Sequence, residues 1–201
     1  MKTWSPLPAL AAVLVTATLA TIPSTAAAEE TPPAKPDDMA AMMAAAREMA
    51  KPVAEHQKLA ALAGTWDQTY QMPGAPPLKG TSVNTPILGG RFLELKVAGG
   101  EGDFRVEGLT VLGFDRRANQ YTLVGFDTWG TYYVTAAGAW DEAAKAWKLP
   151  GENKDPQTGR TETYTFVLRP EGPDRYVMEV LFHMPDGQTV KAVEITSTRR
   201  K

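Results

Sequence analysis

The 201-residue chain contains no cysteine and only two histidines. The lack of cysteine excludes a disulfide framework, a thiolate metal site, a cysteine nucleophile and a lipoprotein anchor. Two histidines are too few for a multi-histidine zinc site, so we expect no metal. The sequence also lacks a nucleophile elbow, a phosphate-binding loop and a dinucleotide fingerprint. We therefore assign no catalytic residues and expect no cofactor.

The chain also lacks an excess of positive charge. It has 21 basic and 23 acidic residues, a formal net charge of −2, and no basic cluster. Nucleic-acid binding needs a concentrated positive patch, so we expect no nucleic-acid partner. With 43% hydrophobic and 22% charged residues, the composition is typical of a folded domain, and the length suits one domain plus tails.

Long hydrophobic runs are absent except near the start of the chain. Residues 1–28 are typical of a secretory signal peptide, with Lys2 followed by an apolar stretch and by the small residues Ala26–Ala28. The apolar stretch has roughly 16 residues and contains Pro8, whereas a membrane span needs about 20. We expect cleavage, and a periplasmic or secreted bacterial protein with no membrane span afterwards.

Proline and methionine shape the next segment. Residues 29–38 contain Pro32, Pro33 and Pro36, which favours a disordered linker. Helical periodicity then predicts helices over 39–50 and 53–63, which together form an N-terminal helical region, 39–63. The methionines of the first helix share one side. That side either rests on the domain or binds a partner.

From Gly64 onward the hydrophobic period changes to two, which is typical of strands separated by turns. Ten strands are predicted, over 65–72, 78–85, 91–98, 104–114, 120–128, 131–140, 145–149, 160–169, 174–184 and 189–199. Short connections make neighbouring strands antiparallel, and closing the sheet removes its free edges. We predict an all-β fold: an antiparallel up-and-down barrel of eight to ten strands over 64–201, preceded by one or two short helices. A β-sandwich is the alternative.

Several motifs resemble a bacterial lipocalin-like family of unknown function (domain of unknown function fifteen seventy-nine). The matching segments are His56–Trp66, Ile87–Leu93, Gly108–Asp115 with Tyr121, Asp127–Thr131, Pro185–Gly187 and Glu194–Thr196. The resemblance implies a barrel and frequent export, and brings no established activity. In lipocalin-type barrels the tryptophan of Gly-x-Trp packs at the closed end, beneath a basic residue of the last strand. The resemblance thus implies structural roles for Trp66 and Arg199.

Polar and aromatic residues on the predicted strands are candidates for a ligand site. Arg91 shares strand parity with Leu93 and Leu95, so it either binds an anionic head group inside the barrel or pairs with a carboxylate. The candidate ligand-binding residues are Arg91, Phe126, Asp127, Trp129, Tyr133, Tyr164, Phe166, Tyr176 and Phe182. The aromatic residues among them either line a cavity or fill a core.

The two histidines have alternative interpretations. His56 either carries a proton or is a structural residue of the second helix, and we assign it the structural role. His183 is either a haem ligand or an exposed side chain.

The predicted function is binding of a small apolar or amphipathic ligand inside an exported barrel. A protein-interaction module that uses the N-terminal helix is an alternative, and so is an enzyme that uses Asp127, Arg91 and a histidine for acid–base chemistry.

Overall fold

The computed structural model describes residues 36–155 and 158–201. The predicted signal peptide, residues 1–28, lies outside the described residues, as does most of the predicted linker. The chain divides into two compact units, residues 1–40 and 41–201. The described part of the first unit is the opening of helix α1 (Pro36–Met49), and the second unit contains the remainder of α1, helix α2 (Ala54–Ala60) and the barrel.

Helix α1 begins inside the predicted linker and corrects its boundary. It starts at Pro36 rather than after residue 38, because proline is well tolerated at the first position of a helix, where its missing N–H is not needed. Within the second unit, the Arg116 guanidinium donates to the carbonyls of Glu48 (2.7 Å) and Met49 (2.9 Å), which stabilises the carboxyl end of α1. Among the described residues, no helix has the length and hydrophobicity needed to cross a membrane.

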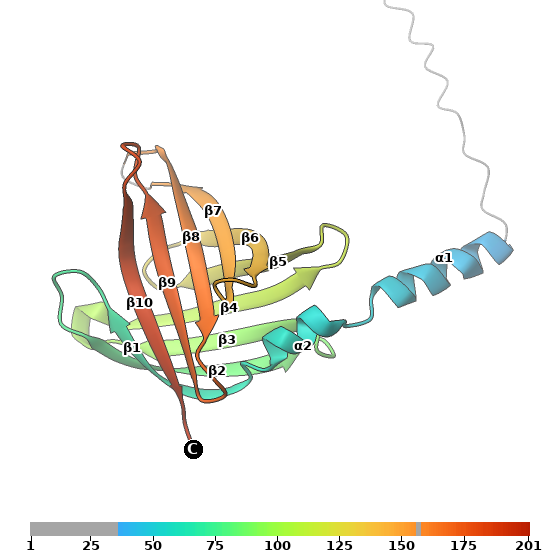
Figure 1. Cartoon of the computed structure of the whole chain (residues 1–201), viewed down its shortest axis with the longest axis horizontal. Helices are drawn as coiled ribbons and strands as arrows, with labels where there is room; N and C mark the ends of the chain where they lie inside the picture. The colour runs from blue at the N-terminus through green and yellow to red at the C-terminus, as the bar shows by residue number, and fades with distance from the viewer. Residues whose placement is uncertain (1–35, 156–157) are drawn as a thin grey trace, which may run out of the picture. The chain divides into compact units, whose positions relative to one another are not determined.

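The described residues from Gly64 onward form ten antiparallel strands that close into a barrel in simple up-and-down order, with β10 beside β1 (Figure 1). The strands are β1 (Gly64–Gln71), β2 (Leu78–Ile87), β3 (Phe92–Gly99), β4 (Val106–Asp115), β5 (Gln120–Asp127), β6 (Tyr133–Asp141), β7 (Ala146–Lys154), β8 (Thr161–Pro170), β9 (Arg175–His183) and β10 (Thr189–Arg199). A short 3-10 helix, Gly102–Phe104, lies between β3 and β4. The barrel prediction is confirmed.

Closure depends on the pairing of the first strand with the last. Trp66 lies opposite Arg199 and Tyr70 lies opposite Ile195, so both strands keep continuous partners. The outward and inward residues alternate along each strand, as the period of two requires. Strand β7 extends beyond the predicted range of 145–149, and its extension pairs with β8 from Gly151 to Lys154.

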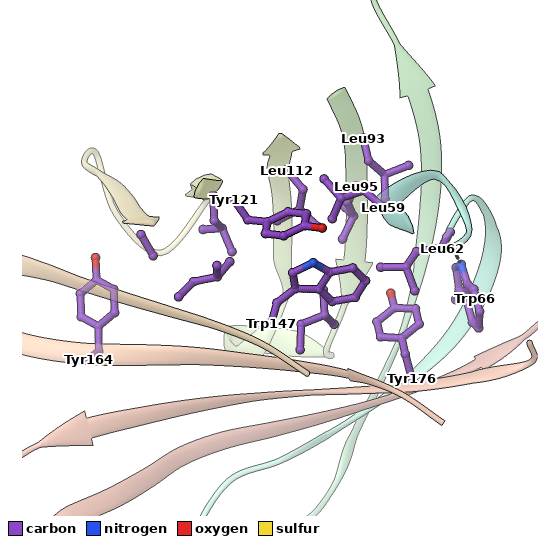
Figure 2. Packing of buried hydrophobic residues seen from close by; sticks show 14 residues of the cluster. Leu59, Leu62, Trp66, Leu93, Leu95, Leu112, Tyr121, Trp147, Tyr164 and Tyr176 are labelled. Atoms are coloured by element: carbon purple, nitrogen blue, oxygen red, sulfur yellow. Dashed lines mark hydrogen bonds between the residues drawn. The ribbon is translucent and has the colours of Figure 1, made fainter. Parts of the chain in front are cut away.

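Part of the hydrophobic core fills one end of the barrel. Leu59 and Leu62, from α2 and the residues after it, pack with Trp66, Tyr121 and Trp147 (Figure 2). These five side chains are each at most 5% exposed. We call this end the closed end, because α2 and these aromatic rings fill it.

Candidate functional site

The other part of the barrel interior is hollow, with a cavity volume of about 300 Å³. That volume lies at the lower limit of small-molecule sites. The lining is mostly aliphatic and aromatic, and consists of Gln68, Tyr70, Met72, Leu78, Leu95, Val97, Gly100, Val106, Gly108, Thr110, Leu112, Leu123, Gly125, Phe126, Asp127, Trp129, Val134, Phe166, Leu168, Tyr176, Met178, Val180, Val193 and Ile195. The barrel is therefore packed solid at one end and open at the other.

Two inward-facing glycines enlarge this cavity. A side-chain carbon added at Gly108 would lie 2.8 Å from a Val97 methyl group, and one at Gly125 would lie 3.0 Å from a Val134 methyl group. Both distances are shorter than ordinary carbon contacts. The two glycines therefore keep the wall of β4 and β5 thin, where a larger residue would intrude on the hollow.

Five of the candidate ligand-binding residues line the cavity. Phe166 and Tyr176 come from the middle of β8 and the start of β9, while Phe126, Asp127 and Trp129 stand at the end of β5 and in the loop after it. Phe126 and Trp129 are also 47% and 55% exposed, so they form part of the cavity mouth.

The loop that carries Trp129 is tied to the neighbouring connection. The Asp127 carboxylate accepts from the Trp129 N–H at 2.8 Å, and the Trp129 indole N–H donates to the Arg105 carbonyl at 3.2 Å. The Thr128 N–H also bonds the Glu107 carbonyl at 3.0 Å. These contacts hold an exposed aromatic side chain at the mouth.

Arg91 is not part of this cavity, which corrects the prediction that it faces a ligand inside the barrel. Its guanidinium donates to the Leu88 carbonyl at 3.0 Å. Leu88, Gly89 and Gly90 all have positive φ, so the chain turns there and β3 begins only at Phe92. Side chains alternate between the two faces of a sheet only within a strand. Arg91 lies in the turn, so the alternation seen at Leu93 and Leu95 does not apply to it.

Tyr133, Tyr164 and Phe182 also lie outside the cavity lining. Tyr133 is 62% exposed, because the next residue, Val134, takes the inward position of β6. Tyr164 is buried, donates its hydroxyl to the Thr135 carbonyl at 3.0 Å, and packs edge-to-face against Phe182. These two rings fill the interior instead of bordering the hollow.

A network of buried polar side chains crosses the inner wall, and sequence reasoning missed it. The Tyr70 hydroxyl donates to Gln68 Oε1 at 2.6 Å, and Gln68 Nε2 donates to the Ser197 hydroxyl at 3.2 Å. Burial raises the pKa of Tyr70 to about 12, so its hydroxyl stays neutral. The signal was present in β1, where residues 66, 68, 70 and 72 share the inward side. A glutamine among three large apolar residues marks an inward polar position.

A second polar group adjoins the first. Asn84 Nδ2 donates to the Leu62 carbonyl at 3.0 Å and to the Tyr176 hydroxyl at 3.3 Å. Ser82 donates to Asn84 Oδ1. Tyr176 packs edge-to-face against Trp66, with ring centroids 4.6 Å apart. Tyr176 therefore belongs both to the cavity lining and to the core at the closed end. We call the part of the lining formed by Gln68, Tyr70 and Tyr176 the floor of the cavity.

Trp66 and Arg199 meet at the closed end. The guanidinium carbon lies 4.2 Å from the Trp66 ring centroid, and the indole N–H donates to the Leu62 carbonyl at 3.0 Å. Arg199 also donates to the carbonyls of Ala61 and Ala63, which lie in the segment between α2 and β1. The two side chains therefore join the last strand, the first strand and the helix.

Neither histidine reaches the cavity. His56 is 7% exposed, its Nδ1 accepts from the Val53 N–H at 3.1 Å, and burial lowers its pKa. His183 is exposed and its ring bonds the hydroxyls of Thr165 and Thr189. His56 and Arg91 border one hollow, separate from the cavity, whereas Asp127 stands at the cavity mouth. The structure therefore does not bring Asp127, Arg91 and a histidine together for acid–base chemistry.

A separate hollow of about 520 Å³ lies outside the closed end. It is bordered by charged side chains, including those of Arg91, Arg116 and Asp115, together with Phe92 and Phe114. Across the described residues, no three His, Cys, Asp or Glu side chains are grouped so that they could hold a metal ion.

The sequence matches a family model described as "Protein of unknown function (DUF1579)" over residues 51–199. Comparison with curated proteins gives no match. Among solved structures, a designed fluorescence-activating β-barrel is 17% identical, with a TM-score of 0.40, and the alignment covers 74% of this chain and 100% of the design. An S-type phycobiliprotein lyase from Guillardia theta is 11% identical, with a TM-score of 0.49, over 74% of this chain and 94% of the lyase.

Proposed function

Because the chain belongs to the DUF1579 family of proteins of unknown function, and because its barrel is hollow, we propose that it binds a small apolar or amphipathic molecule inside the barrel. The observation that carries this proposal is the cavity of about 300 Å³, which opens beside Phe126 and Trp129. Apolar walls with a few placed polar groups are typical of small-molecule sites.

The position of the core supports a container role. Tightly packed side chains at the closed end supply stability, so the open half of the barrel is free to remain hollow. A cavity costs stability through lost contacts, and proteins seldom retain one of this size without use. Asp127 and the exposed aromatic rings mark the mouth through which a ligand would pass.

The experiment is titration of the purified protein with N-phenyl-1-naphthylamine, an uncharged dye whose fluorescence rises in apolar surroundings. We expect saturable binding with one dye per chain, and native mass spectrometry of freshly purified protein should show a co-purified small molecule. Absence of saturable dye binding would overturn the proposal.

A matched pair of variants locates the binding. Thr110 lines the cavity on β4, whereas Thr135 on β6 is exposed on the outer surface. Thr110→Phe should fill the hollow and weaken dye binding at least tenfold, and Thr135→Phe should leave it unchanged. Equal affinity for both variants would place the dye outside the barrel.

The predicted export also belongs to this proposal. Residues 1–28 would direct the chain across the cytoplasmic membrane, so the barrel would meet its ligand in the periplasm or outside the cell. Fractionation of cells that express the full chain should find a shortened protein outside the cytoplasm. A full-length cytoplasmic product would refute export and leave the binding proposal standing.

A protein-interaction role for α1 remains the second candidate, because its methionines are exposed. Met39, Met42, Met43 and Met49 are each between 49% and 62% exposed. Exposed methionines form adaptable apolar contact surfaces. Deleting residues 29–50 should abolish capture of such a partner and leave dye binding intact, whereas unchanged capture would refute this role.

A further inference from the structure

We infer that the cavity takes an uncharged ligand that carries one hydroxyl or carbonyl group, which bonds the hydroxyls of Tyr70 and Tyr176 at the cavity floor, and that it rejects free carboxylates. This inference rests on the proposed ligand-binding function and narrows it to a ligand class.

The charge of the lining is the first observation. Of the described residues that border the cavity, none is a lysine, arginine or histidine, and Asp127 at the mouth is the one carboxylic acid. A buried carboxylate needs a positive partner, because transfer out of water without one is very costly. The cavity offers an anion no such partner, and Asp127 would repel it on the way in.

The position of Arg91 strengthens this point. Barrels that hold anionic lipids need a cation inside, and Arg91 was the candidate for that role. It instead lies in the turn before β3 and bonds the Leu88 carbonyl. The nearby cation Arg105 pairs with Glu107 and is exposed, so it does not supply a positive charge to the interior.

The second observation is unused hydrogen-bonding capacity at the floor. The Tyr176 hydroxyl accepts from Asn84 Nδ2, but across the described part of the chain its own O–H has no acceptor. Tyr176 is 2% exposed, so that donor is buried (Figure 2). A buried O–H donor with no acceptor costs stability, and a ligand oxygen would supply the acceptor.

Tyr70 complements Tyr176. Its O–H is already donated to Gln68, so the lone pairs of its oxygen remain for a ligand O–H. A ligand hydroxyl can donate to Tyr70 and accept from Tyr176, whereas a ligand carbonyl accepts from Tyr176 alone. Gln68, 4% exposed and bonded to Ser197, fixes the Tyr70 hydroxyl in this role.

Displacement of N-phenyl-1-naphthylamine by three ligands of equal chain length tests the inference. At about pH 7.5, where the acid is ionised and the amine is charged, decan-1-ol should displace the dye at concentrations roughly tenfold or more below those needed for decanoate or decylamine. Lowering the pH toward 5 should strengthen decanoate binding, because the neutral acid then becomes abundant.

Tyrosine-to-phenylalanine variants test the floor. With the dye affinity of each variant measured separately and used to convert displacement into decan-1-ol affinity, Tyr176→Phe and Tyr70→Phe should each weaken decan-1-ol binding roughly threefold to tenfold, the usual worth of one hydrogen bond. Tyr164→Phe is the matched control, because Tyr164 bonds the Thr135 carbonyl outside the cavity lining, and it should bind decan-1-ol as the unaltered protein does.

The outcomes separate this inference from the proposed function. If the dye does not bind at all, the ligand-binding function itself fails. If the dye binds and decanoate competes as well as decan-1-ol at about pH 7.5, the function stands and the exclusion of anions is wrong. If neither floor variant changes decan-1-ol binding, the assignment of Tyr70 and Tyr176 is wrong.

Discussion

Replacing Arg199 with alanine should destabilise the barrel more than any other change to a single exposed or half-exposed charge at the closed end. Its guanidinium lies 4.2 Å from the Trp66 centroid and donates to the carbonyls of Ala63 (2.7 Å), Pro173 (2.9 Å) and Ala61 (3.3 Å). One residue thus connects β10, the end of α2, the start of β1 and the turn before β9.

The magnitude follows from those contacts. A cation over an indole contributes about 0.5–2 kcal/mol, and each of three hydrogen bonds contributes about 0.5–1.5 kcal/mol net. The Arg199 side chain is 28% exposed, so water can replace part of these contacts in the variant. We therefore expect Arg199→Ala to lower the free energy of unfolding by about 3 kcal/mol, and Tm by roughly 6–12 °C for a domain of this size.

Urea unfolding followed by tryptophan fluorescence measures the effect, since Trp66 is buried beneath the substituted side chain. Arg199→Lys should lose roughly half as much stability, because the ammonium keeps the charge and lacks the planar fork. Arg200→Ala is the control: Arg200 pairs with Asp67 on the surface and should change stability little. Equal midpoints for Arg199→Ala and Arg200→Ala would refute the reasoning.

Three further predictions concern stability. Gly64→Ala should lower the free energy of unfolding by about 2 kcal/mol or more, because Gly64 has φ +131° and an added carbon would collide with Arg199. Thermal unfolding of Gly64→Ala, with and without Arg199→Ala, would show whether that collision contributes. Burial lowers the pKa of His56, so the unfolded chain takes up protons first as pH falls. Stability should drop below about pH 6.5, and His56→Gln should flatten that slope, whereas an unchanged slope would contradict the reasoning. Leu95→Ala should lower the free energy of unfolding by about 2–3 kcal/mol and enlarge the cavity. An unchanged unfolding midpoint would argue against burial of Leu95.

The sequence was enough to predict the strands and their closure. A period of two over most of the chain and short turns such as Asp186-Gly187 indicated antiparallel strands, because these signals are local. The resemblance carried by Gly64-x-Trp66 implied a lipocalin-type barrel. Strand parity also placed Leu95 and Phe166 on the inward side, and it would have placed Gln68 there had the alternation of β1 been followed through every position.

Only the tertiary structure decided which inward residues border a hollow and which fill a core. Tyr164 and Tyr176 both face inward, yet Tyr164 bonds the Thr135 carbonyl while Tyr176 borders the cavity. The two tyrosines differ because the position of a residue along the barrel axis depends on the register of all ten strands. The alternation of side chains along one strand gives no information about that position. The same dependence on long-range pairing joins Tyr70, Gln68 and Ser197, which lie up to 129 positions apart, into one polar floor.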